Sequence, residues 1–157
     1  MKAEYINPFL NSTKNVLETM CQTPVKALKP ELKKGNKSYG EVSGIIGMAS
    51  EKVKGCMVVS FSEKCILNVV GNMLMEPPKE AIDEEIVDAV GELTNMICGG
   101  AKAQLAKLDH KFDLATPTMI QGKGVEISYL SDSPTLVIPF STDYGEFVIE
   151  ANLGEEE

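Results

Sequence analysis

The sequence predicts an α+β domain in which helices pack on one face of a mostly antiparallel sheet. Apolar residues recur at helical spacing in three segments, and runs of β-branched and small apolar residues mark strands between and after them. With 157 residues, of which 43% are hydrophobic, the chain is large enough to bury a core and too apolar for a disordered protein. We therefore expect a single domain over 1–157.

The first half of the chain predicts one helix and two strands. Asn7 followed by Pro8 resembles a cap with proline in the first turn, and the helix, 5–21, could also begin a few residues earlier. Its apolar face consists of Ile6, Phe9, Leu10, Val16, Leu17 and Met20. After a turn at 35–40, the expected strands are 41–50 and 56–61.

The second half predicts two further helices and the remaining strands. Ser62 opens a helix that runs to about Met75, and Pro77-Pro78 separates it from the longest helix, 81–108. The expected strands are 118–120, 125–130, 135–140 and 146–153, with hairpin turns at Asp132-Ser-Pro and Asp143-Tyr-Gly. Residues 154–157 are expected to form a solvated, disordered acidic tail.

The composition excludes several classes of function. A formal charge of −8 and a pI of about 4.8 argue against a nucleic-acid binder, because affinity for phosphates is carried by Lys and Arg. No apolar run approaches the roughly 18 residues of a membrane span, and the first residues lack the apolar centre of a signal peptide. We expect a cytoplasmic protein that binds neither nucleic acid nor membrane.

Cysteine and histidine usage argues against a metal site in this chain. Cys21, Cys56, Cys65 and Cys98 form no CxxC pair and are expected to be small buried hydrophobes. His110 is the only histidine, which removes most metal-binding and histidine-based nucleophilic chemistry.

Two of the expected helices share a spacing that suggests internal duplication. The pattern Glu4-xxx-Pro8-xx-Asn11 recurs as Asp88-xxx-Glu92-xx-Asn95. Such short matches also arise by chance, but the shared order of a helix followed by strands predicts a pseudo-twofold repeat.

The longest helix has two distinct faces when residues are placed at about 100° intervals. One face is an apolar stripe for the core: Ile86, Val90, Leu93, Ile97 and Ala101. The other face should point outward and carries Glu85, Asp88, Glu92, Asn95 and Gly99. The simplest interpretation is a solvated face whose acidic first turn complements the helix dipole.

The glycines of this helix favour close approach to other groups. Each of Gly91, Gly99 and Gly100 costs roughly 1 kcal/mol relative to alanine inside a helix. Gly100 borders the apolar stripe and would serve internal packing. Gly99 lies on the outer face, where only a partner would need the space.

Glu92 and Asn95 are the candidate functional residues of the outer face. They lie one turn apart, and neither is a nucleophile at neutral pH. A carboxamide can orient a water molecule for in-line attack on phosphorus, and a carboxylate can bind a cation. This combination requires the phosphate and the metal to arrive on another protein. The spacing alone is weak evidence, since a second match occurs at Glu4-Tyr-Ile-Asn7.

Segments 91–102 and 114–122, with their Glu-Leu-Thr-Asn and Thr-Pro-Thr sequences, resemble the signature region of the CheX chemotaxis phosphatases, relatives of CheC and FliY. The resemblance extends over nearly the whole chain and implies one CheX-like domain. It implies dephosphorylation of the aspartyl phosphate of a CheY-type response regulator. Asn95 would orient the attacking water, and Glu92 would pair with the active-site lysine of the regulator.

The same resemblance implies further features of the site and the assembly. Asp88 and Gly99 are candidate partner-binding residues. The chain itself would hold no cofactor, and Mg²⁺ would belong to the regulator. Pro8 stands where the glutamate of a first motif would be, although Asn11 remains, so only the second helix resembles a competent site. A homodimer joined through the sheets is also implied.

Two other functions remain open from the sequence. The same surface could bind a phosphorylated receiver domain without hydrolysing it. A small-molecule enzyme is poorly supported, because no constellation of His, Cys or Ser is evident. The sequence identifies neither the regulator nor the pathway, and it leaves open whether Glu4, Asn7 and Asn11 have a function.

Overall fold

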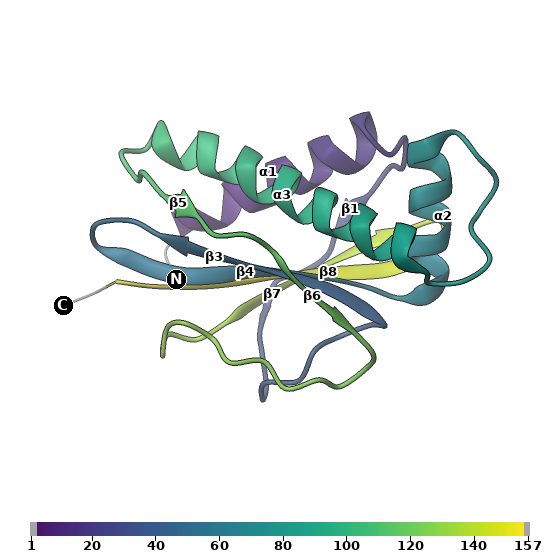
Figure 1. The fold of residues 1–157 in the computed structure, drawn as a ribbon. Coiled ribbons are helices and arrows are strands. Elements are labelled where there is room, and N and C mark those ends of the chain that lie inside the picture. The colour runs from purple at the N-terminus through teal and green to yellow at the C-terminus, as the bar shows by residue number, and fades with distance from the viewer. Residues whose placement is uncertain (1–2, 156–157) are drawn as a thin grey trace.

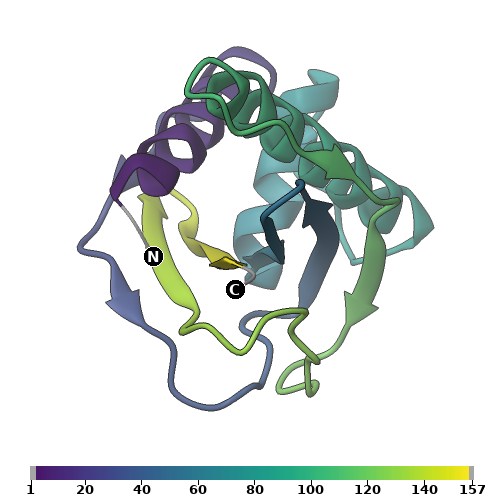
Figure 2. The ribbon, with the colours of Figure 1, turned by 90° about the vertical axis from the view of Figure 1, so that its left-hand side faces the viewer.

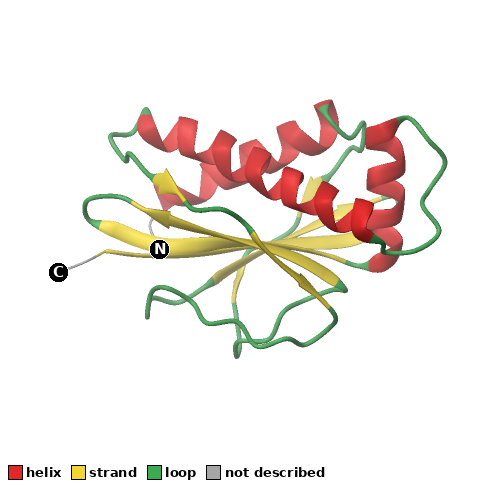
Figure 3. Ribbon diagram, viewed as in Figure 1, coloured by secondary structure: helices red, strands yellow, loops and turns green. Residues whose placement is uncertain are grey.

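The computed structural model describes residues 3–155 as an eight-stranded sheet with three helices packed on one face (Figures 1 and 3). The helices are α1 (Ala3–Thr19), α2 (Glu63–Leu74) and α3 (Glu84–Ala106). The strands are β1 (Lys26–Ala27), β2 (Glu31–Leu32), β3 (Val42–Ala49), β4 (Val53–Phe61), β5 (Asp113–Leu114), β6 (Thr118–Gln121), β7 (Leu136–Thr142) and β8 (Gly145–Glu155).

The sheet is antiparallel, and β4 and β8 form its centre. The strand order is β1-β7-β8-β4-β3-β5, with β2 also pairing with β7 and β6 with β3. The central pair runs in continuous register from Val53 opposite Glu155 to Phe61 opposite Phe147. The predicted α+β class is therefore confirmed. The internal repeat stays a prediction, although β7 and β3 do flank the central pair and α1 lies beside α3 (Figure 2).

The main core lies between the helices and the sheet. The predicted stripe of α3 is fully buried there: Ile86, Val90, Leu93, Ile97 and Ala101. On the sheet, the Phe147 ring lies between the rings of Phe61 and Phe140, with 5.0 Å between centroids in each pair. Burial of these large side chains contributes hydrophobic stabilisation to the packing of the helices on the sheet.

The ends of the helices follow their capping chemistry. Helix α3 begins at Glu84 rather than 81, because the side chain of Asp83 accepts a hydrogen bond from the backbone N–H of Ile86, at 2.9 Å. Helix α2 ends at Leu74, and its C-cap residue Met75 adopts a left-handed conformation with φ of 58°.

Helix α1 begins earlier than Asn7, so the assignment of that residue as its cap is wrong. The helix starts at Ala3 and includes Pro8 in its interior. Tyr5 and Phe9 on either side of the proline are both buried, so their packing holds the first turn although Pro8 can donate no backbone hydrogen bond.

Several strand predictions are corrected by the structure. Residues 125–130 form no strand beyond an isolated bridge between Lys37 and Glu126, because the apolar character of this segment serves loop packing around the buried Ile127. The two-residue strands β1, β2 and β5 are too short to leave a periodic pattern.

The predicted turns and tail differ in their outcomes. The hairpin at Asp143-Tyr-Gly joins β7 and β8 as expected, whereas Asp132 lies in a loop before β7 and not in a hairpin. Gly154 and Glu155 belong to β8, so the tail does not begin at 154. The remaining residues, 156–157, lie outside the described range.

Loops cover the second face of the sheet (Figures 1 and 3). They are held there by a buried ion pair, in which Lys33 Nζ lies 2.7 Å from Glu150 Oε1 and both side chains are at most 1% exposed. The Tyr129 hydroxyl donates to the same Glu150 oxygen, at 2.5 Å. Burial and this hydrogen bond raise the pKa of Tyr129. Lys33 also lies over the ring of Tyr39, 4.7 Å from its centroid.

None of the helices within residues 3–155 combines the length and the apolar character needed to cross a membrane.

Replacing Lys33 by methionine should destabilise the protein. The substitution leaves the carboxylate of Glu150 buried without its cation, which typically costs about 3–5 kcal/mol of unfolding free energy. Urea denaturation measures the loss. Lys34→Met, at the exposed neighbouring position, is the matched control and should change stability by less than about 0.5 kcal/mol. Equal losses for the two variants would show that the loop layer does not depend on this ion pair.

Candidate functional site

The outward face of α3 carries the residues that the sequence singles out. Asp88, Glu92 and Asn95 are exposed, and Gly99 is partly exposed. The neighbouring residues Leu93 and Thr94 are fully buried. The helix therefore divides as predicted, with its apolar stripe in the core and this polar face directed away from the protein.

Glu92 and Asn95 are not engaged by their own fold. Among residues 3–155, no other side chain forms a hydrogen bond or ion pair with either of them. Glu85, in the first turn of the helix, is by contrast paired with Lys79. Since residues three apart on a helix have Cβ atoms about 5–6 Å apart, the carboxylate of Glu92 and the amide of Asn95 lie close enough to contact a single external group.

The two adjacent glycines of α3 have different surroundings. A Cβ atom on Gly99 would meet nothing within 4 Å, whereas a Cβ atom on Gly100 would overlap the hydroxyl of Ser12 in α1. The prediction that Gly100 serves internal packing is therefore confirmed. The fold itself gives no steric reason for Gly99.

The two parts of the sequence motif lie together in space. Strand β6 packs beside α3, and the Met119 sulfur lies 3.5 Å from the place that a Cβ atom on Gly91 would occupy. The strand that follows the Thr-Pro-Thr sequence therefore contacts the helix that carries Glu92 and Asn95.

The corresponding residues of α1 are used within the protein. Pro8 is buried, and the Asn11 side chain donates to Gln104 Oε1 of α3, at 3.3 Å. A Glu4 carboxylate oxygen lies 3.6 Å from His110 Nε2, and Asn7 is exposed. At the positions that correspond to Glu92 and Asn95, the first helix therefore has a buried proline and an asparagine that is engaged within the fold.

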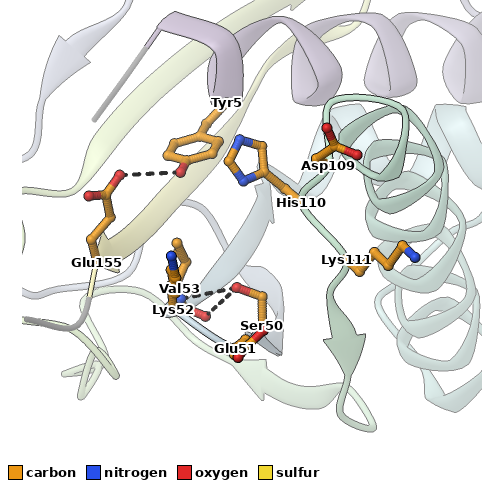
Figure 4. Close-up of a pocket in the computed structure, with 9 residues that line it drawn as sticks. All are labelled: Tyr5, Ser50, Glu51, Lys52, Val53, Asp109, His110, Lys111 and Glu155. Atoms are coloured by element: carbon orange, nitrogen blue, oxygen red, sulfur yellow. Dashed lines mark hydrogen bonds between the residues drawn. The ribbon is translucent and has the colours of Figure 1, made fainter.

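A pocket of about 560 Å³ lies beyond the C-terminal end of α3, at the β3–β4 turn (Figure 4). Its lining mixes Lys52 and Lys111 with acidic side chains. Ser50 hydrogen-bonds the backbone of Val53 through its hydroxyl, and the His110 ring packs edge-on against Tyr5 (Figure 4). Both potential catalytic groups of the pocket therefore have structural roles, and the pocket contains none of the predicted site residues.

The cysteines are free and buried, as predicted. Burial raises the pKa of the Cys56 and Cys65 thiols to about 11 and that of Cys21 and Cys98 to about 12. At neutral pH these groups are protonated and are poor nucleophiles. The described part of the chain also contains no group of three or more His, Cys, Asp or Glu residues arranged to hold a metal ion.

A family model and a relative of known function both indicate the same protein family. Residues 42–141 match the model of the chemotaxis phosphatase CheX family. The CheY-P phosphatase CheX of Thermotoga maritima is 26% identical over 127 residues, which cover 81% of each chain.

Solved structures give the same result over the full length of the chain. A CheC-like superfamily protein from Shewanella sp. PV-4 has a TM-score of 0.89 and 45% identity, with all of both chains covered. CheX from Borrelia burgdorferi, in a complex with CheY, BeF3 and Mg²⁺, has a TM-score of 0.80 and 27% identity, covering 99% of this chain and 100% of the other. The chain that carries this outward polar face is therefore a member of the CheX chemotaxis phosphatase family.

Proposed function

We propose that this chain, a phosphatase of the CheX family, hydrolyses the aspartyl phosphate of a CheY-type response regulator by inserting Glu92 and Asn95 into the active site of that regulator. The observation that carries the proposal is the pair of outward polar side chains that the fold leaves unengaged. Side chains that act on another protein must project from the surface of the protein that carries them. A rigid helix keeps such side chains in a fixed position.

Asn95 supplies the orientation of the attacking water. Its amide can accept a hydrogen bond from a water molecule through oxygen and donate one through nitrogen, which fixes the direction of the lone pair of the water. In phosphoryl transfer the protein contributes mainly position and charge stabilisation, so holding one water in line with the phosphorus–oxygen bond is sufficient chemistry for this residue. The products are a free aspartate on the regulator and inorganic phosphate.

Glu92 supplies docking and register. Its carboxylate would pair with the active-site lysine of the regulator, an interaction between charged groups that strengthens as water is excluded from the interface. Asp88, one turn before it on the same exposed face, would contribute to the same contact.

The metal ion belongs to the partner in this proposal. The Borrelia CheX complex contains CheY together with BeF3, which mimics a phosphoryl group, and Mg²⁺. In the described part of this chain no acidic cluster is arranged to bind a metal. Charge neutralisation at the phosphate would therefore come from the regulator and water orientation from this chain. The homodimer and the cytoplasmic location remain predictions.

Asn95→Ala should abolish most of the acceleration. We expect the rate of receiver dephosphorylation to fall roughly 100-fold, because the water loses its orienting group while the exposed position leaves the fold intact. The lifetime of phosphorylated receiver domains, measured with and without the protein, gives the rate. Asn15→Ala, an exposed asparagine on α1, is the control. A wild-type protein that binds the phosphorylated receiver without shortening its lifetime would instead identify a binding module.

Glu92→Gln should reduce kcat/KM by about 10–100-fold, because a hydrogen bond to a charged group is worth about 1.5–3 kcal/mol. The same lifetime assay, run over a range of receiver concentrations, measures the change. Glu18→Gln, an exposed glutamate on α1, should have no effect. Activity equal to wild type for Glu92→Gln would remove Glu92 from the site.

Gly99→Gln should weaken docking while it strengthens the fold. Glutamine is a better helix former than glycine by somewhat less than 1 kcal/mol, and the space around Gly99 is open in this chain. We expect a higher unfolding free energy together with a KM raised about tenfold, because the added side chain occupies the space of the partner. An unchanged KM in the more stable variant would show that no partner approaches Gly99.

A further inference from the structure

Helix α3 meets strand β3 and helix α1 through the same kind of contact, a buried hydroxyl side chain against a glycine. The geometry points to these contacts, Thr94 with Gly44 and Ser12 with Gly100, as the device that fixes the rotation of α3 and thereby the aim of Glu92 and Asn95. Ser12 and Thr94 are then positioning residues of the phosphatase site, an assignment that rests on the function proposed above.

The first contact joins α3 to strand β3. Thr94 is fully buried, and its hydroxyl donates to the carbonyl oxygen of Val90, at 2.7 Å. A Cβ atom on Gly44 would overlap the Thr94 hydroxyl oxygen and would lie 3.1 Å from its Cβ and 3.3 Å from its Cγ2. Glycine weakens a strand interior, so its presence at position 44 is explained by the close approach of the helix.

The second contact joins α3 to α1, which lies beside it over the sheet (Figure 2). Ser12 is 2% exposed, and its hydroxyl donates to the carbonyl oxygen of Ile97, at 2.5 Å. A Cβ atom on Gly100 would overlap this hydroxyl and lie 3.1 Å from the Ser12 Cβ. The Ser12 hydrogen bond and the absence of a side chain at Gly100 together bring α1 and α3 into contact at one defined position along the axis of α3.

Two contacts of this kind determine the rotation of α3 about its axis and its position along that axis. Positions 94 and 100 are six residues apart, which is about 9 Å along the helix and about 120° around it. Contacts with two different elements at these points oppose both rotation about the helix axis and sliding along it. The outward pair lies on the same turns, since Glu92 and Asn95 bracket Thr94 in the sequence.

A small rotation would be enough to impair catalysis. The end of an exposed helical side chain lies about 5–6 Å from the helix axis, so a rotation of about 10° moves it by about 1 Å. A displacement of that size at a reacting group can cost roughly 100-fold in rate. If these contacts served stability alone, their loss would lower the fraction of folded protein but not the catalytic rate of each folded molecule.

The test enlarges each glycine and then restores the lost space. Gly100→Ala and Gly44→Ala should each lower kcat for receiver dephosphorylation at least tenfold per folded molecule, while KM changes less than threefold. The paired variants Ser12→Gly/Gly100→Ala and Gly44→Ala/Thr94→Ala remove the overlap together with the hydroxyl, so they should regain only part of the lost kcat and stay several-fold below wild type. Gly47→Ala is the matched control in β3, because its Cβ would make only ordinary contacts of 3.4 and 3.5 Å.

Ser12→Ala carries the test if the enlarged glycines prevent folding. It removes the hydroxyl without adding volume, and it should lower kcat several-fold at unchanged KM. Folded Gly44→Ala, Gly100→Ala and Ser12→Ala proteins with the kcat of wild type would overturn this inference, provided that Asn95→Ala is inactive. A wild type without activity, or a fully active Asn95→Ala, would instead overturn the proposed function.

Discussion

Burial of the apolar stripe of α3 against the sheet is the constraint on which the rest of the molecule depends. Leu93 and Ile97 are fully buried, so the opposite side of the same turns must face solvent. The hydrophobic effect thus orients a polar pair that contributes nothing to the core itself. Glu92 and Asn95 need no internal partner to point outward, because their direction is a consequence of helical geometry and of what lies on the other side.

Features that depend on residues close together in the sequence could be predicted, and features that depend on tertiary contacts could not. The long helix was predictable because five stripe residues repeat its period, and the outward pair could be located from the same pattern. The packing role of Gly100 could also be predicted from its angle on the helix, whereas the partner role of Gly99 stays a prediction. By contrast, the general preference of proline for a first turn predicts that position for Pro8, and the burial of Tyr5 that overrides the preference is a tertiary effect.

Contacts between distant segments left no signal in the sequence. Lys33 and Glu150 are 117 residues apart, and neither stands out among the charged residues of the chain. Ser12 and the carbonyl of Ile97 are 85 residues apart, so the contact of Ser12 with Gly100 is evident only in the folded protein. The predicted strand at 125–130 is wrong for the same reason, since Ile127 is buried by packing within a loop and not within a strand.

Gly99 and Gly100 are adjacent in one helix, yet their surroundings differ. If glycine served only to let helices approach, Gly99 would have a neighbour within the fold, yet the space beside it is open. If it served only a partner, Gly100 would not lie against Ser12. Each glycine costs helix stability, so two adjacent ones require two reasons. One close approach is made within the chain and holds α3 still. In the proposed function the open space beside Gly99 receives the partner, and a fixed helix would let Glu92 and Asn95 meet that partner in the correct orientation.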